Sequence, residues 1–317
     1  MRPFSGMNPS PDTHSNTRPL RPKDYVYLGL LRLFSSLPLG FLQSLGGALG
    51  WLVAQSRQNR ALRVVRRNLE LAFPDKSDKW REDTVTQNIV HTGKVMMEFA
   101  KTWGMPPEYS LQLIRQVHNE HLFHEAIHEG HGTIAIVPHF GSWEVMNAWL
   151  SLHVAPVIMY KPGKDPGVDR FVLEARGRLK ATMVSTDESG VKAIFKALKR
   201  NGFTAVLPDH VPETSGGIMA PFFGINTLTG TMVPKLIHRT GARAVMMYCM
   251  RVEGGFDIHF EAPDPDIYNE NLGMATAAMN RSVESVIAAD PVQYQWSYKR
   301  FKRNESLPDP YRKQANS

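Results

Sequence analysis

The chain has 317 residues, which is enough for one large core or for a core with a small appendage. Its apolar share of 42% falls short of that of a polytopic membrane protein. Its single cysteine, Cys249, excludes an intrachain disulfide and a metal site with two cysteines, and it favours a reducing compartment. A formal net charge of +7 favours an acidic partner, and nucleic acid, anionic lipid or an acidic protein would each suit it.

The N-terminal 56 residues differ in composition from the rest of the chain. Residues 1–22 are rich in Pro, Ser and Asn and lack the pattern of a secretory signal, so we expect a disordered tail. Residues 33–56 carry no charge and are long enough to span a membrane, but Pro38, Gln43 and several glycines make a poor span. Arginines without an intervening acid then follow: Arg57, Arg60, Arg63, Arg66 and Arg67.

This order of an apolar segment and an arginine stripe predicts membrane-anchor helices over residues 23–56, next to anionic lipid. Spanning and in-plane insertion both remain open. The alternative is a buried helix pair with a solvated basic face. Gly46 and Gly50 form a small-xxx-small pair, which is weak evidence for helix association.

Beyond the anchor, the pattern of apolar residues changes near residue 130. Residues 57–129 repeat apolar residues every three or four positions and are predicted to be mainly helical. Apolar runs then alternate with helical stretches, which predicts an α/β fold with a mixed, largely parallel sheet flanked by helices. We assign residues 57–303 to this domain and residues 304–317 to a flexible tail. The predicted strands are 133–139, 155–160, 181–185, 203–208, 243–250 and 256–262, and the predicted helices lie near 143–152, 168–179, 189–200, 231–239 and 272–289.

A histidine-rich segment, residues 118–131, contains a sequence typical of zinc proteases, His124-Glu-Ala-Ile-His128. On a helical wheel Phe123 and Ala126 fall on one side and the histidines on the other. No glycine-spaced third histidine follows, and catalytic zinc ligands should face a pocket. We therefore expect an ordinary amphipathic helix, at most with adventitious metal binding, and no catalytic metal.

The stretch IAIVPHFGSWEV, residues 134–145, is an apolar strand that ends on a histidine. His139 would lie at the carboxyl edge of the sheet, where open α/β sheets bind ligands. Ser142 is a good N-cap residue, which would place Glu144 in the first turn of the next helix, beneath His139. A carboxylate there can orient an imidazole that accepts a proton from a substrate hydroxyl. The alternative is a structural histidine with a capping glutamate.

The motif HFGSWE resembles the first motif of the bacterial lipid A biosynthesis acyltransferases, within the glycerolipid acyltransferase superfamily with its His-x4-Asp/Glu signature. The similarity continues in order through residues 160–180, VLPDHVP, APFFGINTLTGT and DPVQYQWSYKRFK, and extends from about residue 25 to residue 303. Three positions depart from the family pattern: Lys161 stands in place of an arginine, Tyr298 stands where many members have histidine, and Leu228 stands in place of a proline.

The resemblance implies an enzyme on the cytoplasmic face of the inner membrane. It would transfer a fatty acyl chain from acyl carrier protein to the hydroxyl of a 3-hydroxyacyl chain on a Kdo-lipid A precursor. No cofactor is expected. Both partners are acidic, so one basic surface could serve both. Nucleic-acid binding would explain the charge but neither the anchor nor the dyad, so no nucleic-acid partner is expected.

Residue roles follow from the matched motifs. His139 would act as base and Glu144 would orient it; Arg176 would grip a phosphate or the developing oxyanion, or else be a solvated helix residue. Asp209 also follows a predicted strand and would position substrate or Arg176, or cap a turn. Phe222 and Phe223, if exposed, would form an acyl groove wall; the alternative is that they pack in the core. The C-terminal motif suits a membrane interface or a helix docked on the sheet. The remaining candidates for substrate binding are Lys161, Arg178, Lys299 and Arg300.

Two further readings stay open. The acceptor could be another membrane glycolipid or phospholipid, with the dyad unchanged. The protein could also be an inactive, membrane-peripheral lipid-binding protein, which would be expected to lack the histidine or the carboxylate.

Overall fold

The computed structural model describes residues 19–56 and 59–312. Residues 1–18 of the predicted N-terminal tail, Arg57 of the arginine stripe and residues 313–317 of the predicted C-terminal tail lie outside the described residues.

Two helices separated by a sharp bend form the predicted anchor region. Pro22 occupies the first helical position of α1 (Pro22–Ser36), and Pro38 follows its end and precedes α2 (Leu39–Ala54). Among the described residues no single helix is long and apolar enough to cross a membrane; α1 and α2 pass that test only together, and they are bent by 120° at the break.

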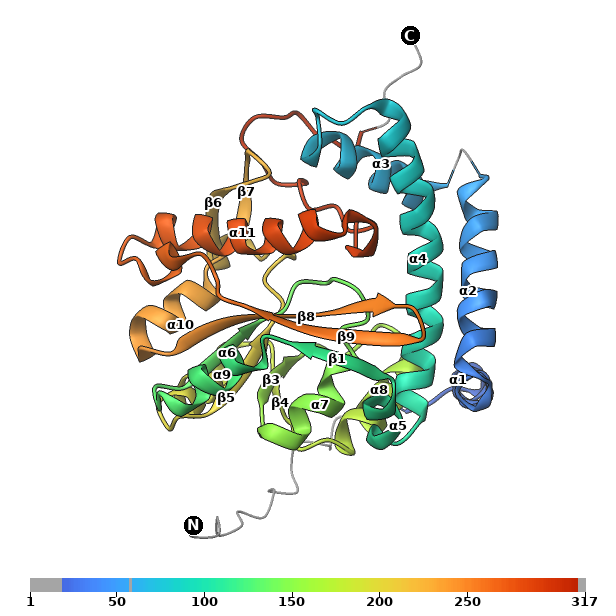
Figure 1. Ribbon diagram of the computed structural model, residues 1–317, viewed down its shortest axis with the longest axis horizontal. Coiled ribbons are helices and arrows are strands. Elements are labelled where there is room, and N and C mark those ends of the chain that lie inside the picture. The colour runs from blue at the N-terminus through green and yellow to red at the C-terminus, as the bar shows by residue number, and fades with distance from the viewer. Residues whose placement is uncertain (1–18, 57–58, 313–317) are drawn as a thin grey trace.

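The α2 helix lies along α4 (Asp78–Gly104), the longest helix in Figure 1. Glycines make this close approach possible: a Cβ on Gly46 would collide with the Gly93 carbonyl, and one on Gly50 would lie 2.6 Å from the Ile89 carbonyl. The small-xxx-small prediction is therefore confirmed. Large apolar side chains of α1 and α2 are exposed, among them Tyr25, Leu33, Phe41, Trp51 and Leu52.

The predicted arginine stripe lies mainly on α3 (Arg60–Ala72). Arg66 pairs with Glu82 of α4, with one of its two hydrogen bonds at 2.8 Å, and Arg67 pairs with Glu70 at 2.9 Å. The sequence has no acid among these arginines, but in the fold Glu82 and Glu70 pair with two of them and balance part of the basic charge.

The central sheet has five strands in the order β1-β9-β8-β2-β5. Strands β8 (Arg243–Val252), β2 (Thr133–Ile136) and β5 (Phe203–Val206) run parallel, β9 (Gly255–Glu261) pairs antiparallel with β8, and β1 (Ile114–His118) pairs parallel with β9. The prediction of a mixed, largely parallel sheet is confirmed. A separate parallel pair is formed by β3 (Val157–Tyr160) and β4 (Thr182–Ser185).

Helices cover both faces of the sheet (Figure 1). Alternate residues of β2 face opposite ways: Ile134 and Ile136 pack in one core cluster, and Ala135 and Val137 pack in the other. The first cluster includes side chains of α3, α4, α9 (Glu188–Leu198), α10 (Met232–Thr240) and α11 (Leu272–Ala289). The second includes side chains of α6 (Glu120–His128) and α7 (Met146–His153).

The structure differs from the sequence prediction in three segments. Strand β1, which follows the short helix α5 (Pro107–Gln112), lies in the region predicted to be mainly helical. Residues 217–230 form an antiparallel hairpin of β6 (Gly217–Phe222) and β7 (Ile225–Gly230), where the sequence pattern predicts neither strand. Residues 304–312 of the predicted flexible tail pack on the domain, where the Tyr311 hydroxyl donates to Asn68 Oδ1 at 2.5 Å and accepts from the Phe301 backbone N–H at 3.0 Å.

We expect Gly46→Ala to destabilise the protein even though alanine has the higher helix propensity. The new methyl group would meet the Gly93 backbone, and over-packing of this kind costs about 1–3 kcal/mol. Gly40→Ala in the same helix is the matched control, because nothing lies within 4 Å of the added Cβ, and it should be neutral or stabilising by up to about 1 kcal/mol. Urea unfolding in one detergent compares the two, and equal midpoints would contradict the close α2–α4 contact.

Candidate active site

Two neighbouring parallel strands bring a histidine and an aspartate together. Strands β2 and β5 are in register, with Ile136 opposite Val206, and each is followed three residues later by a polar side chain, His139 or Asp209. Since the carboxyl ends of parallel strands meet at one edge of a sheet, the two side chains arrive at the same place.

The Asp209 carboxylate holds His139 through two hydrogen bonds. Its Oδ2 accepts from the His139 backbone N–H at 2.9 Å, and its Oδ1 lies 2.8 Å from His139 Nδ1. The carboxylate can only accept, so Nδ1 carries the proton and Nε2 is the free basic nitrogen. Among the described residues Nε2 has no hydrogen-bond partner, and the side chain keeps 15% of its surface exposed.

Burial alone would raise the pKa of Asp209, but the adjacent His139 and its hydrogen bonds, with a further contribution from His210, hold that pKa well below its ordinary value. The carboxylate therefore stays ionised beside the imidazole. An ionised, oriented carboxylate favours the imidazolium that forms when Nε2 accepts a proton.

Glu144, the predicted partner of His139, binds elsewhere. Its Oε1 accepts from Arg176 at 2.9 Å and its Oε2 accepts from Asn147 at 2.9 Å. The reason lies in the start of α7, which begins at Met146 rather than at Ser142, so Glu144 lies in the preceding turn. The buried Ser142 hydroxyl has no hydrogen-bond partner among the described residues and does not cap the helix. The prediction that Glu144 lies beneath His139 is wrong.

Aromatic rings surround the His139 imidazole. His210 stacks on it with centroids 4.0 Å apart, and Tyr298 stacks on the other side of His210 at 3.9 Å. Trp143 meets His139 edge-on at 5.2 Å. Gly141 has φ +57° and a Cβ there would collide with the Cys249 carbonyl, so the turn that follows His139 requires glycine. These contacts restrict the ring to one orientation.

An apolar pocket begins beside this site. Trp143, Glu144 and Arg176 belong to its lining, and Arg176 also lies over the Tyr160 ring at 5.1 Å. The rest of the wall comes from β3, β4, β5 and α7 and from residues that follow β2 and α8. Its apolar members are Val137, Met146, Leu150, Ile158, Met159, Leu179, Ala181, Met183, Ala205 and Leu207. Strand alternation and helix packing bring these residues together from four separate parts of the chain.

A smaller pocket shares Glu144 and Arg176 with the first. Arg176 and Arg178 lie at the end of α8 (Pro166–Gly177), and both line this second pocket together with residues at the end of α4. Arg178 donates to the Trp103 carbonyl. Lys161, another predicted substrate-binding residue, is exposed in the loop between β3 and α8.

Three other predicted substrate-binding residues lie in the packed C-terminal region. Phe222 is fully buried, and Arg300, 1% exposed, stacks over it and donates to the Leu228 carbonyl and the Thr229 hydroxyl of the hairpin. Phe223 packs on Phe73 and Trp296. Phe222 is thus a core residue rather than a groove wall, and Arg300 joins the hairpin to the C-terminal segment rather than facing a ligand. The fourth, Lys299, is partly buried with its ammonium over the Tyr311 ring.

The histidine-rich segment forms the expected amphipathic helix α6, in which Phe123 and Ala126 are buried and His121 and His128 are exposed. His118 is an exception: it lies in β1, not on the helix.

Sequence reasoning missed two neighbours of His139. His210 directly follows Asp209 in the sequence. Both VPH and LPD end a predicted strand with a proline and a polar residue, and this repeated pattern could have identified Asp209 and its neighbour His210 as candidates near His139. Trp143 lies within the first quoted motif, but its ring contact with His139 depends on the turn geometry.

Comparison with known proteins identifies the family of the chain. A family model described as bacterial lipid A biosynthesis acyltransferase matches residues 13–303. The chain is 28% identical over 293 residues to the lipid A biosynthesis lauroyltransferase of Escherichia coli (strain K12), covering 90% of this chain and 94% of that protein. It is 26% identical to a lipid A biosynthesis acyltransferase of Haemophilus influenzae, covering 92% and 96%, and 26% identical to the palmitoleoyltransferase of Escherichia coli, covering 87% and 89%.

We expect Glu144 and Arg176 to be energetically coupled. The side chains are only 6% and 22% exposed, so removing either one leaves the other as an unpaired, poorly solvated charge. In a double-mutant cycle with Glu144→Ala and Arg176→Ala, the double variant should be less destabilised than the sum of the single variants, by about 1–3 kcal/mol in the free energy of unfolding. The Arg170–Glu174 pair of the same helix is the control: at 52% and 39% exposure its coupling should not exceed about 0.5 kcal/mol. Equal coupling in the two pairs would contradict the prediction.

Proposed function

The chain belongs to the bacterial lipid A biosynthesis acyltransferase family, and from this premise we propose that it is a late acyltransferase of lipid A biosynthesis. The donor would be a fatty acyl chain carried as a thioester on acyl carrier protein. The acceptor would be the hydroxyl of a 3-hydroxyacyl chain on a Kdo-lipid A precursor. No cofactor is required for this reaction.

The observation that carries the proposal is the His139–Asp209 pair beside an apolar pocket. Nε2 of His139 is available to a substrate, Nδ1 is held by a buried carboxylate, and Trp143 contacts the ring and also lines the pocket. A base next to an apolar wall suits a reaction between an alcohol and a fatty acyl thioester.

In the proposed mechanism Nε2 of His139 removes the proton of the acceptor hydroxyl as its oxygen attacks the thioester carbonyl. Asp209 stabilises the imidazolium that results. The tetrahedral intermediate then collapses, the carbon–sulfur bond breaks, and the imidazolium returns the proton to the departing thiolate. The products are the new ester and the free thiol of the carrier, and the enzyme regains its starting state.

Glu144 has a different role in this proposal. Its ion pair keeps Arg176 at the lip of both pockets, so that guanidinium N–H groups not bonded to Glu144 can bind an anionic oxygen. The oxyanion of the tetrahedral intermediate and a phosphate of the acceptor are the two anions that the reaction offers. Arg176 is thus proposed to bind substrate, with Glu144 as its positioning residue.

The proposed location is the cytoplasmic face of the inner membrane, and the exposed apolar side chains of α1 and α2 support contact with a membrane. Tyr25, Leu33, Phe41 and Leu52 are each more than half exposed, which is costly in water and favourable in lipid. The net charge of +7 suits anionic lipid, the phosphorylated acceptor and an acidic carrier protein alike.

We expect His139→Asn to lower kcat/KM by about 10²–10⁴-fold, because positioned base catalysis supplies roughly that factor. Asp209→Asn should lower kcat by about 10²-fold or more, since an amide cannot stabilise the imidazolium. The assay mixes purified protein, acyl carrier protein with one defined chain and the Kdo-bearing tetra-acyl precursor, and mass spectrometry counts the acyl units gained. His121→Asn, an exposed histidine of α6, is the matched control and should retain wild-type activity.

Retention of near-normal turnover by folded His139→Asn would refute the mechanism. Offering several lipids in one reaction separates the alternatives. Acylation of a different glycolipid or phospholipid would show that the acceptor belongs to that lipid class. If the protein binds vesicles but acylates no lipid, the result supports an inactive lipid-binding protein.

Narrowing the apolar pocket should shorten the preferred acyl chain. Ala205→Leu adds three carbons to the pocket wall on β5 and would occupy the space of the last methylenes of the acyl chain. Each methylene that can no longer be buried loses about 0.8 kcal/mol of binding free energy, so the preferred donor should become shorter by about two carbons. Competition among carrier-bound chains of 10 to about 16 carbons measures the preference. Leu152→Phe on the exposed side of α7 is the control and should leave the preference unchanged. An unchanged preference in Ala205→Leu would place the acyl chain elsewhere.

A further inference from the structure

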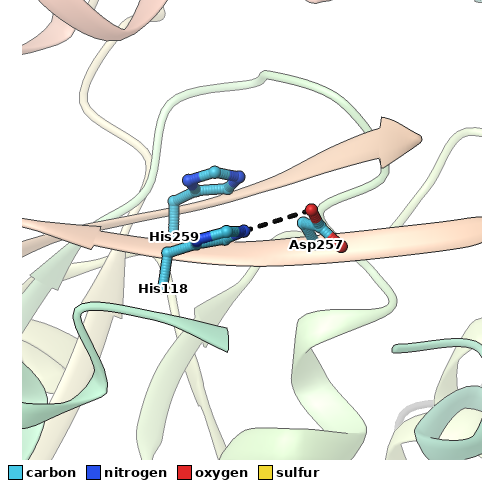
Figure 2. Close-up of side chains that lie close together, drawn as sticks. All are labelled: His118, Asp257 and His259. Atoms are coloured by element: carbon cyan, nitrogen blue, oxygen red, sulfur yellow. Dashed lines mark hydrogen bonds and ion pairs between the residues drawn. The ribbon is translucent and has the colours of Figure 1, made fainter. Parts of the chain in front are cut away.

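A second cluster of ionisable side chains lies on the outer strands of the sheet, away from His139. His118 ends β1, and its partner in the parallel register is His259 of β9. Asp257 lies two residues before His259, on the same face of that strand. Figure 2 shows the two imidazoles one above the other with the carboxylate beside their tips.

The three groups are close enough to share one ion. A nitrogen of each histidine and an oxygen of Asp257 lie within 4.8 Å of one another. His118 Nε2 is 3.1 Å from Asp257 Oδ2, and the second carboxylate oxygen, Oδ1, is buried with no hydrogen-bond partner among the described residues. An unpaired buried carboxylate oxygen costs free energy unless another group satisfies it.

We propose that His118, Asp257 and His259 bind a divalent transition-metal ion of the Zn²⁺ or Co²⁺ type. Two imidazoles and one carboxylate are a donor set that such ions take in proteins, with the remaining positions filled by water. Because the imidazole rings are stacked 4.3 Å apart, one ring has to tilt out of the stack before a nitrogen of each can bind the same ion. His118 is the ring free to tilt, because 37% of its side chain is exposed.

The strands make this site more rigid than the other histidine cluster of the described residues. Glu120, His124 and His153 also lie within 4.8 Å of one another, but they come from two helices, and the Glu120 and His124 side chains are 40% and 43% exposed. Asp257 is only 14% exposed, and the backbone register of β1 with β9 holds both histidines side by side. Less side-chain freedom is lost on binding, which favours the strand site.

The proposed ion has no part in the acyl transfer. In the sheet β8 separates β9 from β2, the strand that leads to His139, and β1 lies one strand further out. An ion held by β1 and β9 would link the edge strand to its neighbour. Because it would bind the folded state only, it would raise the unfolding temperature as its concentration rises above its dissociation constant.

The test uses the tag-free, metal-stripped full chain in detergent, titrated with Co²⁺ and followed by visible absorption and calorimetry, with Zn²⁺ as competitor. We expect one tight site whose affinity falls at least about tenfold in Asp257→Asn and in His118→Gln, with the metal-dependent rise in unfolding temperature lost in both. His124→Gln disrupts the helix cluster and is the matched control; it should bind as tightly as the wild type.

Unfolding of each variant without metal shows whether that variant folds. Because His118 and Asp257 lie on different strands, one variant still tests the site if the other does not fold. Equal affinity in the wild type, Asp257→Asn and His118→Gln would mean an adventitious ion only and would overturn the proposal. So would loss of the tight site in His124→Gln. Because binding and unfolding are measured without lipid or acyl donor, neither result depends on the acyltransferase activity.

Discussion

The parallel register of β2 with β5 is the constraint on which the rest of the site depends. Ile136 pairs with Val206, each strand is followed by three residues that include a proline, and the chain therefore delivers His139 and Asp209 to one point at the edge of the sheet. The carboxylate binds both the backbone N–H and the ring of His139, so it fixes the loop and the tautomer together. A shift of one residue in this register would turn the side chains to opposite faces and separate the pair.

The two carboxylates near His139, those of Asp209 and Glu144, have different partners. Asp209 is buried beside the imidazole and is kept ionised by it, whereas Glu144 is paired with a guanidinium at the lip of the pockets. The H-x4-E signature therefore does not describe a single hydrogen-bonded pair in this protein. Its histidine and its acid belong to two neighbouring networks that a substrate would join; in the mechanism that we propose, one moves the proton and the other binds negative charge.

What the sequence could predict depended on whether the signal was local. The alternation of apolar runs and helical stretches predicted β2, β3, β4, β5, β8 and β9 to within a few residues. The helical wheel of residues 118–131 correctly placed Phe123 and Ala126 inside and His121 outside. The partner of His139 was assigned to the near residue, Glu144, because spacing along one segment carries no information on strand pairing. Asp209 is 70 residues away, and only the register of β2 with β5 joins the two. The same holds for Arg300, whose charge suggested a ligand but whose partners are hairpin carbonyl and hydroxyl oxygens. The hairpin itself was missed because its strands lie among glycines and prolines that predict loops.

The packing of the N-terminal helices bears on how a lipid could reach this chemistry. Lys101 of α4 donates to the Ser35 and Leu37 carbonyls at 2.7 and 2.8 Å and so ties the end of α1 to the domain. Its neighbours Thr102 and Trp103 line the smaller pocket with Arg176, and α1 also packs on α8, which carries Arg176. The helices that expose large apolar side chains, α1 and α2, thus rest on α4 and α8, which carry residues of the smaller pocket, including Arg176. If those faces lie in the membrane, an acceptor whose acyl chains remain in lipid needs to move only its polar part to reach Arg176 and His139. The close α2–α4 contact at Gly46 and Gly50 then has a functional reason as well as a structural one, since it fixes the distance between the lipid surface and the base.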